Sequence, residues 1–183
     1  MIAENTLLRI WEGCKVNDRK QQELLYKVLA PKMLAVCMRY TTDRDEAQDV
    51  LQEGFIKIFK NLHNYRGEGS LEGWIRRIMA HTAISRYRKL KPMMLSEEIS
   101  ENSVPCYTSN QNNKMEAQEL MTIIQQLPGN YRSVFNLYAI EGYSHQEIGT
   151  MLGITELLSR TTLHRARGIL KKKVLQLEAY QAN

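Results

Sequence analysis

The chain has 183 residues, enough for one domain or two small ones, and it carries a net charge of +5 at pH 7 with a pI near 9.1, which favours an anionic partner. No apolar run approaches the roughly 18 residues of a membrane span, and the N-terminal segment lacks the basic start and apolar core of a signal peptide. We therefore expect a cytoplasmic protein without membrane insertion. Three widely spaced cysteines, Cys14, Cys37 and Cys106, indicate reduced thiols, the first two buried as small apolar side chains. Neither a metal site nor a cofactor is expected.

The first 91 residues predict a bundle of packed helices. Apolar residues recur at helical spacing in three segments, residues 4–13, 18–40 and 43–62. Asp18 and Asp43 fit helix N-caps, and Glu46 completes a capping pair with Asp43. Pro31 is expected to break or kink the second helix. Because packing helix against helix is the only way to bury these stripes, the fold class is all-α.

Residues 43–91 combine an acidic helix, a glycine-rich elbow and a basic, aromatic helix. The elbow, Asn64 to Ser70, consists of turn formers, and Ser70 begins the next helix. Its inward stripe is predicted to hold Leu71, Trp74, Ile75, Ile78 and Thr82. Cations and aromatics lie off that stripe, at Arg76, Arg77, His81, Arg86, Tyr87, Arg88 and Lys89. Cations suit phosphates and ring faces suit unstacked bases, so this stretch predicts nucleic-acid binding.

A change of composition at residues 92–115 predicts a linker between two domains. Prolines, serines and asparagines dominate there, with no sustained period. A flexible segment of that length spans roughly 25–30 Å on average, so two domains could hold separated sites on one DNA. Met93, Met94 and Leu95 are the apolar exception. They either form a separate contact or end the preceding helix, and we favour the second interpretation because helix ends fray by a residue or two.

Residues 116–183 predict a second helical domain with a helix-turn-helix. Leu120, Ile123, Ile124 and Leu127 follow helical spacing, and residues 128–130 interrupt the helix. Residues 144–147 form a capping box that opens a short helix, Gly153 supplies a tight turn, and Thr155 caps a basic helix running to about Leu177. Its inward residues are predicted to be Leu163, Ala166, Leu170 and Val174. A short helix, a glycine turn and a longer basic helix are typical of DNA-binding helix-turn-helix units.

The face of this long helix opposite the apolar stripe carries the candidate base readers. Arg160 and Arg165 can each fork onto O6 and N7 of guanine, while Thr161 and His164 can reach bases or phosphates. A basic face that is merely solvated is the alternative; the helix-turn-helix pattern favours DNA reading. A nuclease or transferase is disfavoured, because the four histidines have no acid or cysteine at nucleophile or metal spacing and there is no P-loop.

Both halves resemble bacterial sigma factors of the extracytoplasmic-function (ECF) type. Region 2 of that family has the patterns D-x-x-Q-E-x-F, aromatic-Arg-Gly-acidic and W-x-x-R-I. They match Asp49, Gln52, Glu53 and Phe55, then Tyr65 to Glu68, then Trp74, Arg77 and Ile78. Region 4 is matched by Leu127-Pro128, by EGYSHQEIGTMLGIT and by LHRAR at residues 163–167. The two halves stand in the family's order and cover almost the whole chain except the linker.

This resemblance implies an alternative sigma factor, not an enzyme, with region 2 at residues 1–91 and region 4 at residues 116–183. It would bind core RNA polymerase through the β′ coiled coil and the β flap, and promoter DNA at two elements; an anti-sigma factor is a further implied partner. Asp49, Gln52, Glu53 and Phe55 would contact the polymerase, although an acidic solvated face is the plain alternative. A flipped base of the minus-ten element would enter a pocket of Tyr65, Gly67, Glu68, Arg77, Ile78 and His81. The minus-thirty-five element would be read by Arg160, Thr161, His164 and Arg165.

Three positions leave alternatives open. His81 stands where the family often has asparagine, so the preferred base is not fixed. Trp74 fits core packing as well as a binding role, and its place on the apolar stripe favours the core. Leu157 and Leu158 replace the glycine and the hydroxyl residue of the family's E-G-T. Either Leu157 points toward DNA and weakens phosphate contact unless it meets a thymine methyl, or both leucines pack on the preceding helix or on another protein surface.

A stand-alone helix-turn-helix regulator is the second functional hypothesis. Such a protein would carry a ligand-binding or receiver domain ahead of its helix-turn-helix. This chain has the acidic helix and the aromatic elbow in that place. The sigma-factor interpretation is therefore favoured.

Overall fold

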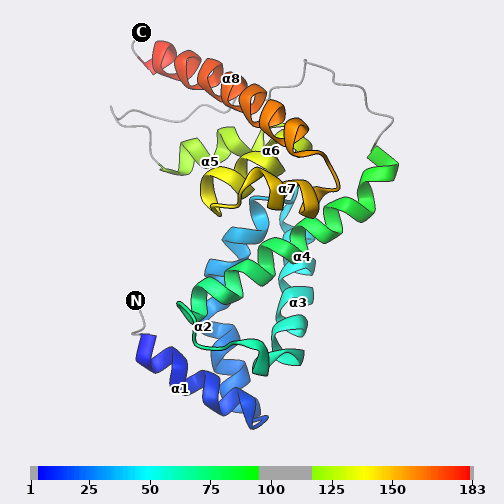
Figure 1. The fold of residues 1–183 in the computed structure, drawn as a ribbon. Coiled ribbons are helices and arrows are strands. Elements are labelled where there is room, and N and C mark those ends of the chain that lie inside the picture. Colours follow the sequence, from blue (N-terminus) through cyan, green and yellow to red (C-terminus); the bar gives the residue numbers. More distant parts are fainter. Residues whose placement is uncertain (1–3, 95–116, 182–183) are drawn as a thin grey trace. The chain divides into compact units, whose positions relative to one another are not determined.

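The structure, a computed structural model, describes residues 4–94 and 117–181, and all the regular elements within these ranges are helical (Figure 1). The chain divides into two compact units, residues 1–86 and 87–183. The predicted all-α class is confirmed. The predicted linker lies mostly outside the described residues, so its boundaries stay predictions.

Four helices and one short 3-10 turn build the first unit. They are α1 (Glu4–Lys15), α2 (Arg19–Met38), α3 (Arg44–Lys60), η1 (Leu62–Asn64) and α4 (Leu71–Met94), which from Tyr87 onward belongs to the second unit. Helix α2 packs between α1 and α3. The largest fully buried side chains come from all four helices and include Trp11, Leu25, Leu29, Met33, Ile58, Leu71, Ile75 and Met79. Their burial supplies the hydrophobic stabilisation of this unit.

Both predicted N-caps of the first unit are confirmed. Asp18 accepts from the amides of Lys20 and Gln21, and Asp43 accepts from the amide of Glu46 at 2.8 Å. The Glu46 carboxylate reaches back one residue further than a standard capping box, to the amide of Thr42 at 3.1 Å. Each contact satisfies a backbone donor that the helix itself leaves without a partner.

Of the two effects expected of Pro31, the break does not occur, because α2 continues from Arg19 to Met38, and the kink stays a prediction. Proline removes one backbone donor and crowds the preceding turn, an effect that favours a helix end. Here the residues on either side, Leu29 and Met33, are both buried. Tertiary packing of this buried stripe therefore holds the helix together across the proline.

Helix α4 begins directly after the glycine-rich elbow. Gly67 and Gly69 adopt φ values of 79° and 83°, a left-handed backbone that suits glycine. The Ser70 hydroxyl accepts from the amide of Gly73 at 3.1 Å, which confirms the predicted helix start. The helix runs to Met94, so Met93 and Met94 continue it as favoured, and Leu95 lies outside the described residues. Of the predicted inward stripe, Leu71, Ile75 and Thr82 are buried, whereas Trp74 and Ile78 are half-buried.

Gly54 sets the close approach between α3 and α4. A Cβ atom at this position would overlap Sδ of Met79, a side chain that is fully buried. Because Gly54 has only a hydrogen in place of a side chain, the sulfur of Met79 can occupy that space. Because its neighbours enclose Met79, the side chain has little room to move away.

The second unit is built around one long helix. Its elements are α5 (Ala117–Gln125), α6 (Gly129–Phe135), the π-helical turn η2 (Asn136–Ile140), α7 (His145–Leu152) and α8 (Glu156–Gln181). Helix α8 packs against α5, α6 and α7 (Figure 1). One core cluster contains Ile123, Ile124, Leu127, Tyr131, Ala166 and Leu170. Leu163 is buried and Val174 half-buried as expected, but Leu120 is exposed although its spacing predicted burial.

The helix-turn-helix of α7 and α8 has the predicted caps and turn. Ser144 and Glu147 form a complete capping box. Gly153 adopts φ 68° at the end of α7, and the Thr155 hydroxyl accepts from the amide of Leu158 at 3.1 Å. The prediction of a short helix, a glycine turn and a capped long helix is confirmed.

The other predictions from composition are tested only in the described part of the chain. Cys14 and Cys37 are buried and free, and burial raises the pKa of these thiols to about 11 and about 12. Cys106 lies outside the described residues. Within residues 4–94 and 117–181, no helix is long and apolar enough to cross a bilayer, and no group of three potential metal ligands occurs.

We expect Gly54→Ala to lower the free energy of unfolding of the first unit by about 1–3 kcal/mol, the usual effect of overpacking a core. Both tryptophans of the chain, Trp11 and Trp74, belong to this unit, so denaturant unfolding followed by tryptophan fluorescence reports on it alone. Gln48→Ala is the matched control, since Gln48 is an exposed residue of the same helix α3 and of the same unit. An unchanged transition midpoint for Gly54→Ala would contradict the close-approach argument.

Candidate functional site

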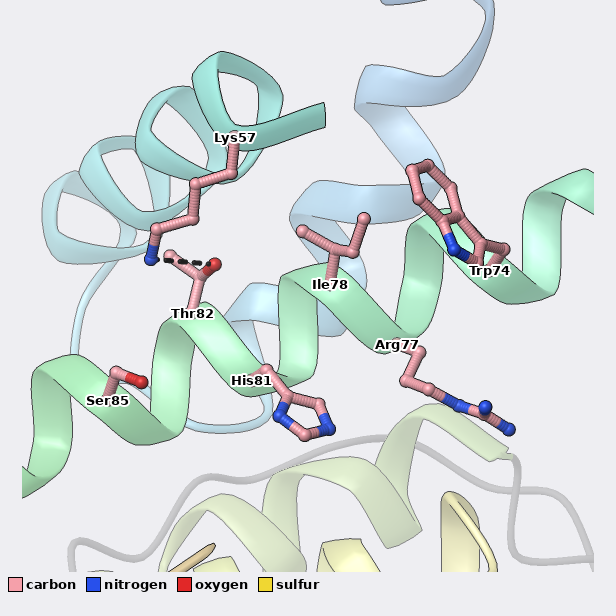
Figure 2. A pocket seen from close by; sticks show the side chains of 7 residues that line it. All are labelled: Lys57, Trp74, Arg77, Ile78, His81, Thr82 and Ser85. Carbon is pink, nitrogen blue, oxygen red and sulfur yellow. Dashed lines mark hydrogen bonds between the residues drawn. The ribbon is translucent and has the colours of Figure 1, made fainter. Parts of the chain in front are cut away.

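A pocket of about 340 Å³ lies between α3 and α4 in the first unit (Figure 2). Helix α3 contributes Lys57, and α4 contributes Trp74, Arg77, Ile78, His81, Thr82 and Ser85. The α4 residues follow one another at alternating intervals of three positions and one, so they share one face of the helix. A pocket of this size lies at the lower end of the range for small-molecule sites.

Polar groups of different kinds surround the apolar part of this pocket. Lys57 Nζ donates to Thr82 Oγ1 at 3.3 Å and forms an ion pair with Glu53 at 2.8 Å. Arg77 and His81 leave α4 at the other edge of the same face (Figure 2). Partial burial, aided by the Arg77 guanidinium, lowers the pKa of His81. A neutral imidazole can donate one hydrogen bond and accept another, as a reader of base edges must.

The elbow tyrosine is held beside this pocket by two tryptophans. The Tyr65 ring lies 5.9 Å from Trp11 and 5.8 Å from Trp74, centroid to centroid, and its hydroxyl donates to the Gly69 carbonyl at 2.8 Å. Trp74 is half-buried; it packs on Trp11 at 5.5 Å and also lines the pocket. Both interpretations of Trp74 therefore hold in part. Tyr65 braces the pocket through Trp74 and is not among the residues that line it.

The structure thus gathers half of the predicted base pocket. Arg77, Ile78 and His81 share one cavity, whereas Gly67 and Glu68 are exposed in the elbow and do not line it. Sequence reasoning missed three lining residues, Lys57, Thr82 and Ser85. Ser85 continues the helical spacing of Ile78 and Thr82 and could have been found from it. No local signal places Lys57, because it comes from a different helix.

The acidic residues of α3 form a mostly exposed surface. Asp49 and Gln52 are exposed and Glu53 is half-buried. Asp49 pairs with Arg86 of α4 at 2.9 Å, and Glu53 pairs with Lys57. Exposed pairs of this kind contribute about 0–1 kcal/mol, so these carboxylates can exchange partners at little cost.

Phe55 does not belong to that surface, and its burial does not support a polymerase contact, so that assignment stays a prediction. Its side chain is only 3% exposed, and it packs on Tyr26 and Phe59 with ring centroids 4.7 and 5.9 Å away. Phe55 lies on the apolar stripe of α3, together with the buried Leu51 and Ile58. Its spacing therefore places it in the core.

The four predicted base readers all lie on the exposed side of α8. Arg160, Thr161, His164 and Arg165 are exposed, and the buried Leu163, Ala166 and Leu170 face the core. The Arg160 guanidinium forms an ion pair with Glu156, to which its Nε donates at 3.1 Å. The Thr161 hydroxyl donates to the carbonyl of Leu158 at 3.0 Å. This side of α8 is called the reading face below.

A buried contact that the sequence did not reveal joins the two helices of the helix-turn-helix. Nδ1 of His145, the first residue of α7, lies 2.9 Å from Oγ of Ser159 in α8. The imidazole stacks on Tyr138 at 4.5 Å, and the Arg167 guanidinium lies over the same tyrosine ring at 5.6 Å. The capping pattern drew attention to the backbone around His145 and not to its side chain. The contact fixes α7 to α8 just below the reading face.

Leu157 and Leu158 are both exposed, at 71% and 49% of their surface. The interpretation in which they pack on the preceding helix is therefore not supported. A surface role remains for them, toward DNA or toward another protein.

We expect acidification to destabilise the helix-turn-helix through His145. Burial, with Arg160 and Arg167 nearby, lowers the pKa of this imidazole below its ordinary 6.5. The unfolded chain then binds more protons. The stabilisation is fully present above pH 6.5 and is lost as the pH falls from there toward the lower folded value. Amide hydrogen exchange in α7 and α8 measures the change, and His145→Gln should flatten it. The same pH dependence in both proteins would assign it to other groups.

Comparisons with known proteins give one consistent result. Residues 25–92 match the family described as Sigma-70 region 2, and residues 117–170 match the family described as Sigma-70, region 4. The chain is 28% identical to the RNA polymerase sigma-H factor of Pseudomonas aeruginosa over 97% of this chain and 98% of that protein. It is 29% identical to the ECF RNA polymerase sigma factor SigW of Bacillus subtilis, over 89% of this chain and 94% of that one.

A solved structure is similar in fold. The sigma factor RpoE of Bartonella quintana, solved in complex with the anti-sigma factor NepR, aligns with a TM-score of 0.50 and 18% identity. The alignment covers 82% of this chain and 94% of that chain.

Proposed function

The chain belongs to the sigma-70 family as an alternative sigma factor of the ECF type that directs transcription initiation, and we propose how its surfaces divide that task. The first unit binds core RNA polymerase and the minus-ten element. The second unit reads the minus-thirty-five element. The observation that carries the proposal is the presence of regions 2 and 4, in that order, each with an exposed polar face on its last helix.

In the second unit, the reading face of α8 enters the major groove. Arg160 and Arg165 stand a little over one turn apart, and each guanidinium can bind O6 and N7 of one guanine. Glu156 holds Arg160 in place before DNA arrives. Pre-orientation of this kind lowers the entropy lost when a long side chain binds. The contact between His145 and Ser159 keeps α7 and α8 at a fixed angle, so that the face meets the groove in one orientation.

In the first unit, the pocket between α3 and α4 receives an unstacked base of the non-template strand. Ile78 and the Trp74 ring supply an apolar surface for the base, and neutral His81 supplies a donor and an acceptor for its edge. Lys57 and Arg77 stand at the pocket for the adjacent phosphates. We extend the pocket to Tyr65 as the residue that holds Trp74 in position, and to Gly67 and Glu68 as the exposed elbow along which the strand passes.

Core RNA polymerase is bound by the acidic surface of α3. Asp49, Gln52 and Glu53 face a basic part of the β′ coiled coil, and the second unit binds the β flap. Charge complementarity at such a surface gives orientation and association rate more than affinity. An anti-sigma factor is proposed as a further partner, by analogy with the complex in which the Bartonella quintana sigma factor was solved.

A reconstitution experiment tests the proposed function. The full chain is mixed with core RNA polymerase, and the mixture is analysed for co-elution and for transcription from defined start sites on a library of genomic fragments. We expect a stable complex and start-site-specific transcripts. DNA binding without either result would favour a stand-alone regulator instead.

Asp49→Arg should weaken binding to core RNA polymerase roughly tenfold or more, because a repulsive pair replaces an attractive one. The substitution also removes the ion pair with Arg86, which by itself stabilises the fold by about 0–1 kcal/mol. Arg86→Met is the matched control, since it breaks the same pair and leaves the carboxylate in place. Affinity for core is measured by fluorescence anisotropy of the labelled full chain. Equal losses in both variants would mean that the ion pair, and not the charge of Asp49, matters.

Tyr65→Ala should weaken binding of a single-stranded minus-ten oligonucleotide by up to about 1–3 kcal/mol, the range for one base stacked on an aromatic ring, here the ring of Trp74. The reason is the loss of the ring that braces Trp74. Tyr65→Phe keeps the ring and removes only the hydrogen bond to Gly69, so it should bind nearly as well as the wild type. Both variants are compared on single-stranded minus-ten DNA and on duplex minus-thirty-five DNA. A loss of the same size on both probes would identify Tyr65 as a general folding determinant.

A further inference from the structure

The reading face of α8 has a large apolar side chain at its centre. Leu157 is 71% exposed, more than Leu158 or Leu175 of the same helix. At 100° per residue, Leu157 and His164 lie within about 20° of each other around the helix axis, with Arg160 and Thr161 on either side. Scattered exposed leucines need no explanation. One that stands one turn before the base readers, on the same side of the helix, must meet the same surface as they do.

In the first turn of α8, the polar groups around Leu157 are bonded to one another, and the leucine side chain extends into solvent. The Thr155 hydroxyl accepts from the amide of Leu158 at 3.1 Å, so the cap occupies that donor. Glu156 and Arg160, the residues one before and three after Leu157, are paired with each other. The polar side chains around Leu157 are therefore held by internal contacts.

We propose that Leu157 is a specificity-determining residue that contacts the C5-methyl group of a thymine in the major groove of the minus-thirty-five element. This inference rests on the proposed function of α8. The residues near the start of a recognition helix are those that reach base edges. Along the major groove, the thymine methyl is the apolar group that the bases present, and apolar side chains recognise it.

The charge around Leu157 favours duplex DNA over an apolar protein surface. Arg160, Arg165 and Arg167 are exposed near it on α8, and Lys171 and Lys172 are exposed further along. An apolar partner that covered Leu157 would also have to desolvate these cations, which is costly when they find no anions. DNA offers a phosphate for each cation and a methyl group for the leucine. Leu158, about 100° further round the helix and beside Arg165, lies at the edge of the face and is given no such role.

The experiment removes a single methyl group from the DNA. The complex of the full chain with core RNA polymerase selects minus-thirty-five sequences from a duplex library randomised at that element. Each thymine in the selected sequence is then replaced, one at a time, by deoxyuridine. We expect one replacement to weaken binding about fourfold, the factor that corresponds to one buried methyl or methylene group.

Leu157→Ala should abolish that uridine effect and should keep the preference for guanines opposite Arg160 and Arg165. Leu175→Ala is the matched control, because Leu175 is a leucine of the same helix, 53% exposed, and about 27 Å further along its axis. It should keep the wild-type uridine effect in full. Changing the leucine and the thymine methyl separately and together measures their interaction, apart from any general loss of DNA affinity.

Several outcomes would overturn the inference. A selected element in which no single uridine matters, or a uridine effect that survives in Leu157→Ala, would exclude the methyl contact while leaving the proposed function intact. If Leu157→Ala lowered the affinity for core polymerase and left the uridine effect unchanged, the leucine would contact the polymerase and not the DNA. A complex that fails to form, or that selects no sequence, would reject the proposed function together with this contact.

Discussion

The close approach of α4 to α3 is the constraint on which the first unit depends. Helix α4 buries Met79 where Gly54 has no side chain, and neighbouring residues of the same helix line the pocket. Two ion pairs join α4 to its neighbours, Glu72 with Lys32 of α2 at 2.7 Å and Arg86 with Asp49 of α3 at 2.9 Å. Because both are exposed, they orient the helix more than they stabilise it.

This arrangement couples the acidic surface of α3 to the pocket. Glu53 of the acidic surface pairs with Lys57, and Lys57 bonds to Thr82 inside the pocket. A partner that draws the Glu53 carboxylate outward would leave the Lys57 ammonium without its anion. An ammonium in that state attracts a phosphate more strongly. In the proposed function, binding of the polymerase at the acidic surface and binding of a strand at the pocket would thus be linked through one lysine.

In the second unit, helix α8 is packed firmly on its inner side, and most of its outer side is exposed. Helix α8 buries Leu163, Ala166 and Leu170 in its packing against α5, α6 and α7. The contact between Ser159 and His145 fixes its first turns to α7. Since the cap, the ion pair of Arg160 with Glu156 and this contact all act within the first few residues, the readers start from a defined geometry. A face that is ordered in this way would bind with little rearrangement of its side chains or backbone.

The sequence by itself determined the helical class, the caps at Asp18, Asp43 and Ser144, the turn at Gly153 and the exposed side of α8. Each of these follows from local rules, that is, from the side chains a helix end requires and from the period at which apolar residues recur. The same periodicity placed Phe55 in the core, and only the resemblance to the family suggested a contact surface there. Tertiary structure decided what depends on two segments distant in the chain. Lys57 joins Thr82 and Ser85 in one pocket, Tyr65 packs on Trp11 and Trp74, Pro31 is carried within a continuous helix, and His145 meets Ser159. These contacts arise from the way helices cross, and a one-dimensional pattern records the face of each helix but not the partner that the face meets.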